Sequence, residues 1–82
     1  MQANRKGADP CRPESVQRAV LALTLERHPR WTPMKDLRRE IGCGGVVHHA
    51  IRDLIAIGLI ERKSATVRPT SAAAHFERLK LP

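Results

Sequence analysis

Apolar residues recur at three- and four-residue steps through the middle of the chain. Between residues 46 and 58 they share one face of an α-helix: Val47, Ala50, Ile51, Leu54 and Gly58. The opposite face is polar and carries His48, His49, Arg52 and Asp53. The preceding Gly42-Cys43-Gly44-Gly45 is too rich in glycine to continue a helix, so we predict a tight turn followed by an amphipathic helix.

The same periodicity predicts two helices before this turn. The first begins near Pro13 and Glu14 and ends before Pro29, with an inward stripe of Val16, Ala19, Val20, Leu23 and Arg27, widened by Leu21 and Leu25. The second opens with Thr32 as its cap and Pro33 as its first residue. Its inner face holds Met34, Leu37 and Ile41, and Gly42 ends it in a left-handed conformation.

After residue 58 the pattern changes from helical steps to alternation. Ile60-Glu61-Arg62 and Thr66-Val67-Arg68 are predicted to form a hairpin, with Ile60 and Val67 inward and Arg62 and Arg68 outward. Arg30 and Trp31 are expected to add a short third strand, with Trp31 covering the core. A final helix over residues 72–79, capped by Thr70 or Ser71, carries an apolar face of Ala72, Phe76 and Leu79.

The end of the central helix has the pattern Leu-x-x-x-Gly-Leu-Ile, which stands here as Leu54-Ile55-Ala56-Ile57-Gly58-Leu59-Ile60. Together with the helix, turn and helix before it, this pattern resembles the winged-helix family of DNA-binding domains. The resemblance spans residues 14–76. It implies a mostly α fold with a small antiparallel β-hairpin: a three-helix core, a wing and a C-terminal helix. We expect this domain to occupy residues 13–82, behind a flexible basic arm at residues 1–12.

Composition and charge point to a small domain with a polyanionic partner. The chain has 82 residues, enough for one modest core, and Trp31 and Phe76 are its only aromatic residues besides histidine. Its 15 Lys and Arg against 8 Asp and Glu give a formal net charge of +7. Nucleic acid is the leading candidate partner, although charge alone also fits a small basic protein without one.

The family resemblance implies sequence-specific binding of double-stranded DNA, as in a small transcriptional regulator of bacterial, plasmid or phage type. The helix over residues 46–58 would enter the major groove, and Arg52 would contact a guanine. Asp53 would pair with a neighbouring arginine. The expected DNA-binding residues are Lys35, Arg38, Arg39, Gly45, Val46, His48, His49, Arg52, Arg62, Lys63 and Arg68. A plain solvated helix face is an equal alternative for Lys35, Arg38 and Arg39.

Other chemistry finds less support in the sequence. Adjacent histidines on a helix point about 100 degrees apart, so His48 and His49 with Cys43 make a poor metal site, and we predict no metal and no cofactor. No orienting third group accompanies Cys43, so we predict no enzyme activity. Cys11 and Cys43 are expected to be reduced, in a cytoplasmic or nucleoid-associated protein. No apolar run is long enough to cross a membrane.

Two alternatives concern assembly. The domain could instead be a winged-helix docking module within a larger assembly, which the apolar Ile55 and Ile57 favour. A second copy of the chain is also expected as a partner, because one short recognition helix reads few bases. The predicted dimer contact is the terminal helix with Ala72, Phe76 and Leu79, whereas the alternative is that this helix packs back onto the first helix.

Overall fold

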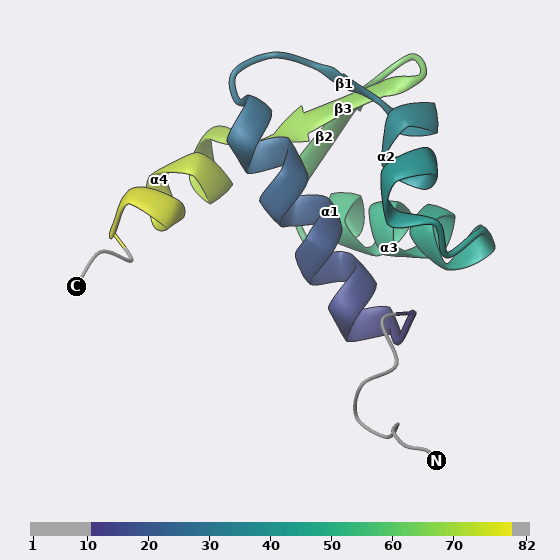
Figure 1. Cartoon of the computed structure of the whole chain (residues 1–82). Coiled ribbons are helices and arrows are strands. Elements are labelled where there is room, and N and C mark those ends of the chain that lie inside the picture. Colours follow the sequence, from purple (N-terminus) through teal and green to yellow (C-terminus); the bar gives the residue numbers. More distant parts are fainter. Residues whose placement is uncertain (1–10, 80–82) are drawn as a thin grey trace.

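The computed structural model describes residues 11–79, which form four helices and a three-stranded antiparallel sheet (Figure 1). The elements in order are α1 (Pro13–Arg27), β1 (Thr32–Pro33), α2 (Met34–Ile41), α3 (Gly45–Ala56), β2 (Ile60–Lys63), β3 (Thr66–Pro69) and α4 (Ser71–Leu79). The predicted class, mostly helical with a small antiparallel sheet, is confirmed. Residues 1–10 of the expected basic arm lie outside the described residues.

The core lies where α1, α2 and α3 meet one face of the sheet. Nine buried apolar side chains form it: Val16, Val20, Leu37, Val47, Ala50, Ile51, Leu54, Ile60 and Val67. Four of them are the predicted inner face of α3, at three- and four-residue steps. The core is almost wholly aliphatic, as the scarcity of aromatic residues predicts.

The buried stripe of α1 differs from the predicted one in its second half. Thr24 is fully buried, whereas Ala19, Leu23 and Arg27 are only partly covered. The buried positions follow a four-residue step from Val16 through Val20. The Thr24 hydroxyl is tolerated in the core because it lies 3.0 Å from the carbonyl oxygens of both Val20 and Leu21 and donates its hydrogen bond there. Because threonine is polar, the periodicity of apolar residues did not predict that position 24 is buried.

The first strand is displaced from its predicted position. It consists of Thr32 and Pro33 rather than Arg30 and Trp31, and α2 begins only at Met34. Thr32 lies opposite Val67 of β3, and the Met34 amide donates to the Ala65 carbonyl oxygen at 2.9 Å. Pairing with β3 therefore takes Thr32 out of its predicted role as helix cap.

The buried Thr32 hydroxyl supports a stability prediction. Its Oγ1 atom has no hydrogen-bond partner among residues 11–79. We expect Thr32→Val to raise the free energy of unfolding by about 1 kcal/mol, because it removes an unsatisfied polar group at nearly constant volume. Thr24→Val is the matched control and should lower it by about 1 kcal/mol, because it removes a satisfied hydroxyl. Urea denaturation of both variants checks the pair, and shifts of the same sign would contradict it.

The hairpin has the predicted strands, but its two arginines lie on opposite faces. Arg62 is opposite the buried Val67, and Glu61 is opposite Arg68. Directly opposed residues share a face of the sheet, so Arg62 projects from the core face and Arg68 from the outer face. The prediction that both point outward was wrong, since residues two apart, such as Ile60 and Arg62, lie on the same side. Arg62 remains exposed, and the hairpin tip lies beside the start of α2 (Figure 1).

The reversal after α3 matches the prediction. Gly58 has a φ of 86°. Its amide donates to the Ile55 carbonyl oxygen, while the Leu59 amide donates to that of Leu54, in the two-bond pattern that ends many helices. Gly42 likewise ends α2 with a φ of 77°. Leu59 is thereby returned to the side of the core.

The terminal helix α4 turns a different face inward than predicted. Thr70 caps it, accepting from the Ala73 amide at 3.2 Å and donating to the Gly58 carbonyl oxygen at 2.8 Å. Ala73 is its buried residue, whereas Ala72 is exposed and Phe76 and Leu79 are each 67% exposed. The predicted apolar face therefore faces outward in the single chain.

Candidate nucleic-acid interface

The outer face of α3 is the centre of the candidate interface. His48, His49 and Arg52 are exposed on it, opposite the four residues that hold the helix in the core. The two imidazole rings lie edge to face with their centroids 6.1 Å apart. Arg52 makes no ion pair or side-chain hydrogen bond with any residue that the structure describes. Gly45, the first residue of α3, is also exposed, so the start of the helix is open to a ligand.

Part of this surface lies beside α1, because Val46, His49 and Asp53 share the side of α3 that is next to it. Val46 is partly buried against the core and lines a cleft of about 340 Å³ that also includes Pro13, Gln17, His49, Ala50 and Asp53. The Asp53 carboxylate accepts a hydrogen bond of 3.2 Å from the Gln17 side-chain amide. Within residues 11–79 Asp53 therefore has Gln17 as its partner and not the predicted arginine, because the helical turn that carries Asp53 faces α1.

The basic residues of α2 are exposed as predicted, but they differ in their partners. Arg39 donates to Asp36 one turn earlier at 2.9 Å, which offsets its charge. Lys35 and Arg38 form no ion pair within residues 11–79. These two side chains and that of Arg52 also make no side-chain hydrogen bond or ring contact within residues 11–79.

The hairpin cations are held in place by neighbouring groups. The Arg62 Nε donates to the Ser64 carbonyl oxygen at 2.7 Å. The Arg68 Nε donates to Glu61 at 2.9 Å, while its guanidinium carbon lies 4.4 Å from the centre of the Trp31 ring. The Lys63 ammonium lies 5.9 Å from the same ring. Cation–π attraction of this kind favours both positions over the indole, by about 0.5 to 1 kcal/mol at an exposed site.

Trp31 is the residue of this region whose role sequence reasoning missed. It is partly buried and serves as a platform for Lys63 and Arg68 on the outer face of the sheet. The alternation of side chains along the two strands could have predicted this arrangement. With Ile60 and Val67 inward, Lys63 and Arg68 must share the outer face. The strand next to β3 then brings Trp31 beside them.

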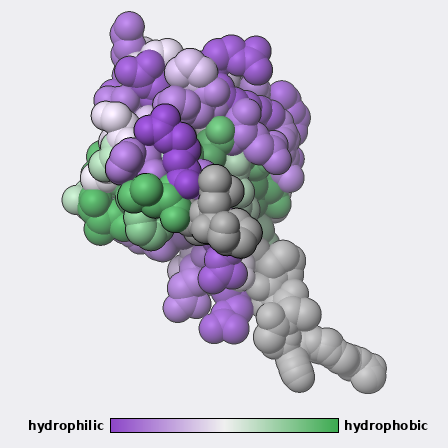
Figure 2. All heavy atoms as spheres, turned by 90° about the vertical axis from the view of Figure 1, so that its left-hand side faces the viewer, coloured by the Kyte–Doolittle hydropathy of each residue, from purple (hydrophilic) through white to green (hydrophobic). Residues whose placement is uncertain are grey.

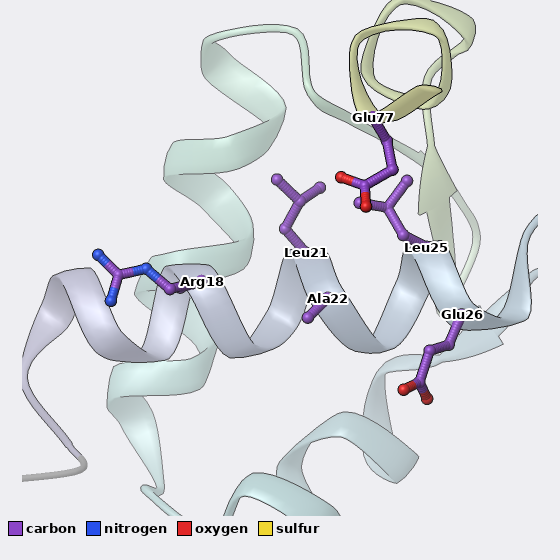
Figure 3. A pocket seen from close by; sticks show the side chains of 6 residues that line it. All are labelled: Arg18, Leu21, Ala22, Leu25, Glu26 and Glu77. Atoms are coloured by element: carbon purple, nitrogen blue, oxygen red, sulfur yellow. The ribbon is translucent and has the colours of Figure 1, made fainter. Parts of the chain in front are cut away.

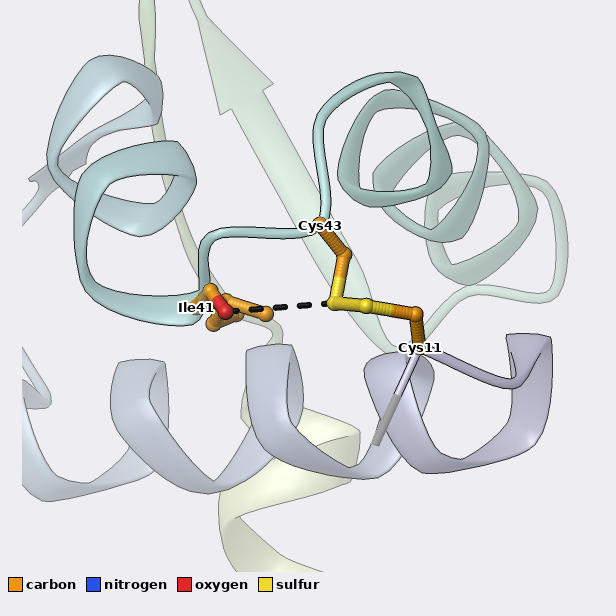
Figure 4. The surroundings of a disulfide bond; sticks show 3 residues. All are labelled: Cys11, Ile41 and Cys43. Carbon is orange, nitrogen blue, oxygen red and sulfur yellow. Dashed lines mark hydrogen bonds between the residues drawn. A yellow bond between two sulfur atoms is a disulfide. The ribbon is translucent and has the colours of Figure 1, made fainter. Parts of the chain in front are cut away.

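A disulfide joins Cys11 to Cys43, with the two Cα atoms 5.5 Å apart (Figure 4). It connects the residues just before α1 to the turn between α2 and α3. The Cys43 sulfur also lies 3.9 Å from the Ile41 carbonyl oxygen. The expectation of two reduced cysteines was wrong, and so was the placement of Cys11 in a flexible arm. With both sulfurs bonded, Cys43 has no thiol for nucleophilic chemistry.

Two further properties of residues 11–79 limit the chemistry of the interface. No three His, Cys, Asp or Glu side chains among them are grouped closely enough to hold a metal ion. None of the described helices has the length and apolar character needed to cross a membrane.

Comparison with known proteins found no match to a family model, a curated protein or a solved structure. The resemblance to winged-helix domains therefore remains a prediction from the sequence pattern, with which the observed order of elements is compatible.

Proposed function

We propose that this domain binds duplex DNA in the manner of a winged helix, as a small transcriptional regulator. The observation that carries the proposal is the exposed face of α3, where His48, His49 and Arg52 project from a helix whose other face is fixed in the core. A helix of this width fits the major groove, and arginine and histidine can donate hydrogen bonds to base edges or phosphates.

The surrounding elements supply the remaining charge. In a helix-turn-helix the first helix crosses the DNA backbone, which assigns Lys35 and Arg38 of α2 to phosphates. The β2–β3 hairpin would place Arg62 and Lys63 on the backbone beside the groove. Arg68 would contribute mainly by holding the Trp31 platform, because Glu61 already offsets its charge.

The salt dependence of binding tests this proposal. Each cation that neutralises a phosphate lowers the slope of log K against log salt by about 0.9. If Lys35, Arg38, Arg62 and Lys63 bind phosphates as proposed, the slope should be about −4, and a phosphate contact by Arg52 as well would bring it to roughly −4.5. Fluorescence anisotropy of labelled duplexes at several salt concentrations measures it. No binding at low salt would refute the proposal.

Single substitutions separate base reading from backbone contact. Arg52→Ala should weaken binding to the preferred sequence by about 1 to 3 kcal/mol and reduce sequence preference. Lys63→Ala should weaken all sequences alike, because a phosphate contact carries no sequence information. Arg30→Ala is the control, since Arg30 is exposed but lies outside the proposed interface. The preferred sequence comes from selection among randomised duplexes, and equal losses of specificity in Arg52→Ala and Lys63→Ala would contradict the docking.

Of the two residues that suggested the second candidate function, a protein docking module, only Ile57 still favours it. Ile57 is 66% exposed at the end of α3, whereas Ile55 packs against the core and no longer supports it. If a partner protein docks on this end of α3, Ile57→Ser should abolish the binding of that partner and leave any DNA affinity of the domain unchanged. A measurable salt-dependent DNA affinity in the unmodified domain favours the first candidate.

A further inference from the structure

The outer surface of α1 carries two opposite charges at equal distances from one small side chain. Arg18, Ala22 and Glu26 are exposed at steps of four residues, and Leu21 and Leu25 flank them (Figure 3). These five residues and Glu77 of α4 line a depression of about 410 Å³. In Figure 3, Leu21 and Leu25 point toward α4, and Glu77 points down toward Leu25.

The charges at the two ends of this stripe have no partner in the described chain. Neither Arg18 nor Glu26 forms an ion pair or side-chain hydrogen bond within residues 11–79. They cannot pair with each other, because eight residues of helix separate them by about 12 Å. Each therefore remains available to a partner that approaches α1.

We infer that a second copy of the chain packs against this surface, with a twofold axis passing near Ala22. Two α1 helices would then run antiparallel, and each residue four positions before Ala22 would face the residue four positions after it in the partner. Arg18 of one copy meets Glu26 of the other, and the reverse pair forms on the far side of the axis. The small side chain of Ala22 lets the helices approach closely at the axis.

The adjoining side of α4 extends the same surface. A second depression, of about 300 Å³, shares Leu21, Leu25 and Glu77 with the first and adds Leu59, Ala73 and Phe76. Phe76 and Leu79, one turn further along α4, are each 67% exposed. Figure 2 shows hydrophobic residues gathered on this side of the molecule, with hydrophilic residues above them. Contiguous apolar surface rimmed by charge is typical of protein contacts.

The self-complementary charges select a second copy over an unrelated partner. An interface about a twofold axis requires the same patch on both chains to match itself, and Arg18 and Glu26 at equal distances from Ala22 meet that condition. This assignment places the axis on α1, with α4 at its side, whereas the sequence suggested α4 alone. It does not depend on DNA binding and is tested without DNA.

Charge reversal tests the interface directly. In Arg18→Glu both ends of the stripe become acidic, and in Glu26→Arg both become basic, so each variant should dimerise roughly tenfold or more weakly than the unmodified chain. An equimolar mixture of the two variants restores both opposite-charge pairs and should form the heterodimer. Sedimentation equilibrium of the full chain measures each dissociation constant, and circular dichroism checks that each variant is folded.

Two further variants sharpen the result. Ala22→Glu places two identical charges together at the axis and should give a monomer. Arg38→Glu is the control: it changes the net charge as much as Arg18→Glu does, but on α2, and should leave the dimer intact. The inference is overturned by an unmodified chain that stays monomeric at millimolar concentration. It is also overturned by variants that dimerise as the unmodified chain does, or by a mixture that fails to recover the dimer.

Discussion

Removal of the Cys11–Cys43 disulfide is expected to lower the free energy of unfolding by roughly 3 to 4 kcal/mol. The two cysteines are 32 positions apart in the sequence, so the bond closes a large loop in the unfolded chain. The loop includes all of α1 and α2 and the start of the turn before α3. Because a domain of this size has a net stability of only several kcal/mol, the loss should be a large fraction of the total.

Urea denaturation with and without a thiol reductant measures this effect, and Cys11→Ser/Cys43→Ser should reproduce the reduced midpoint. The double variant is also the control, because a reductant should not change its midpoint. An unchanged midpoint on reduction of the unmodified chain would show that the bond does not constrain the unfolded state.

The elements that sequence analysis predicted well are those defined by local periodicity. The inner face of α3 emerged correctly because its four buried residues repeat at helical steps, and Gly58 marks the reversal by its positive φ. The hairpin was located because Ile60 and Val67 each stand among polar residues. In these cases the deciding interactions lie within a few residues of each other.

The errors arose where distant segments decide the outcome. Thr32 looks like a helix cap in sequence, but its pairing with Val67 across the sheet makes it a strand residue. Thr24 is polar, and only its hydrogen bonds inside α1 explain its burial. The Cys11–Cys43 bond follows from the folding of α1 beside the turn before α3, which no local pattern contains.

For the candidate interface residues, exposure to solvent was predictable from the sequence, but their ion pairs were not. The exposed positions of α2 and α3 follow from the helical period, which placed Lys35, Arg38 and Arg52 correctly on the surface. The sequence did not indicate that Asp36 and Glu61 would offset Arg39 and Arg68. Such pairing depends on side-chain rotamers and strand register. Which cations have an acidic partner can therefore be seen only in the folded chain.

Gly44 lies in the turn that sets the direction of α3. We expect Gly44→Ala to lower the free energy of unfolding by about 3 kcal/mol. Gly44 has a φ of 57° and a ψ of −130°, a combination that a side chain strongly disfavours. A Cβ atom added at Gly44 would meet no other atom within 4 Å, so the cost is one of backbone conformation.

The neighbouring Gly45 provides a matched control for this backbone effect. Gly45 is the first residue of α3 and also has open space around its Cα atom. Gly45→Ala should raise the free energy of unfolding by about 0.5 to 1 kcal/mol, because alanine favours the helix and glycine does not. Denaturation of both variants by urea measures the difference. Opposite signs at adjacent glycines would confirm that residue 44 requires glycine, whereas a neutral Gly44→Ala would show that the turn before α3 can adopt another conformation at little cost.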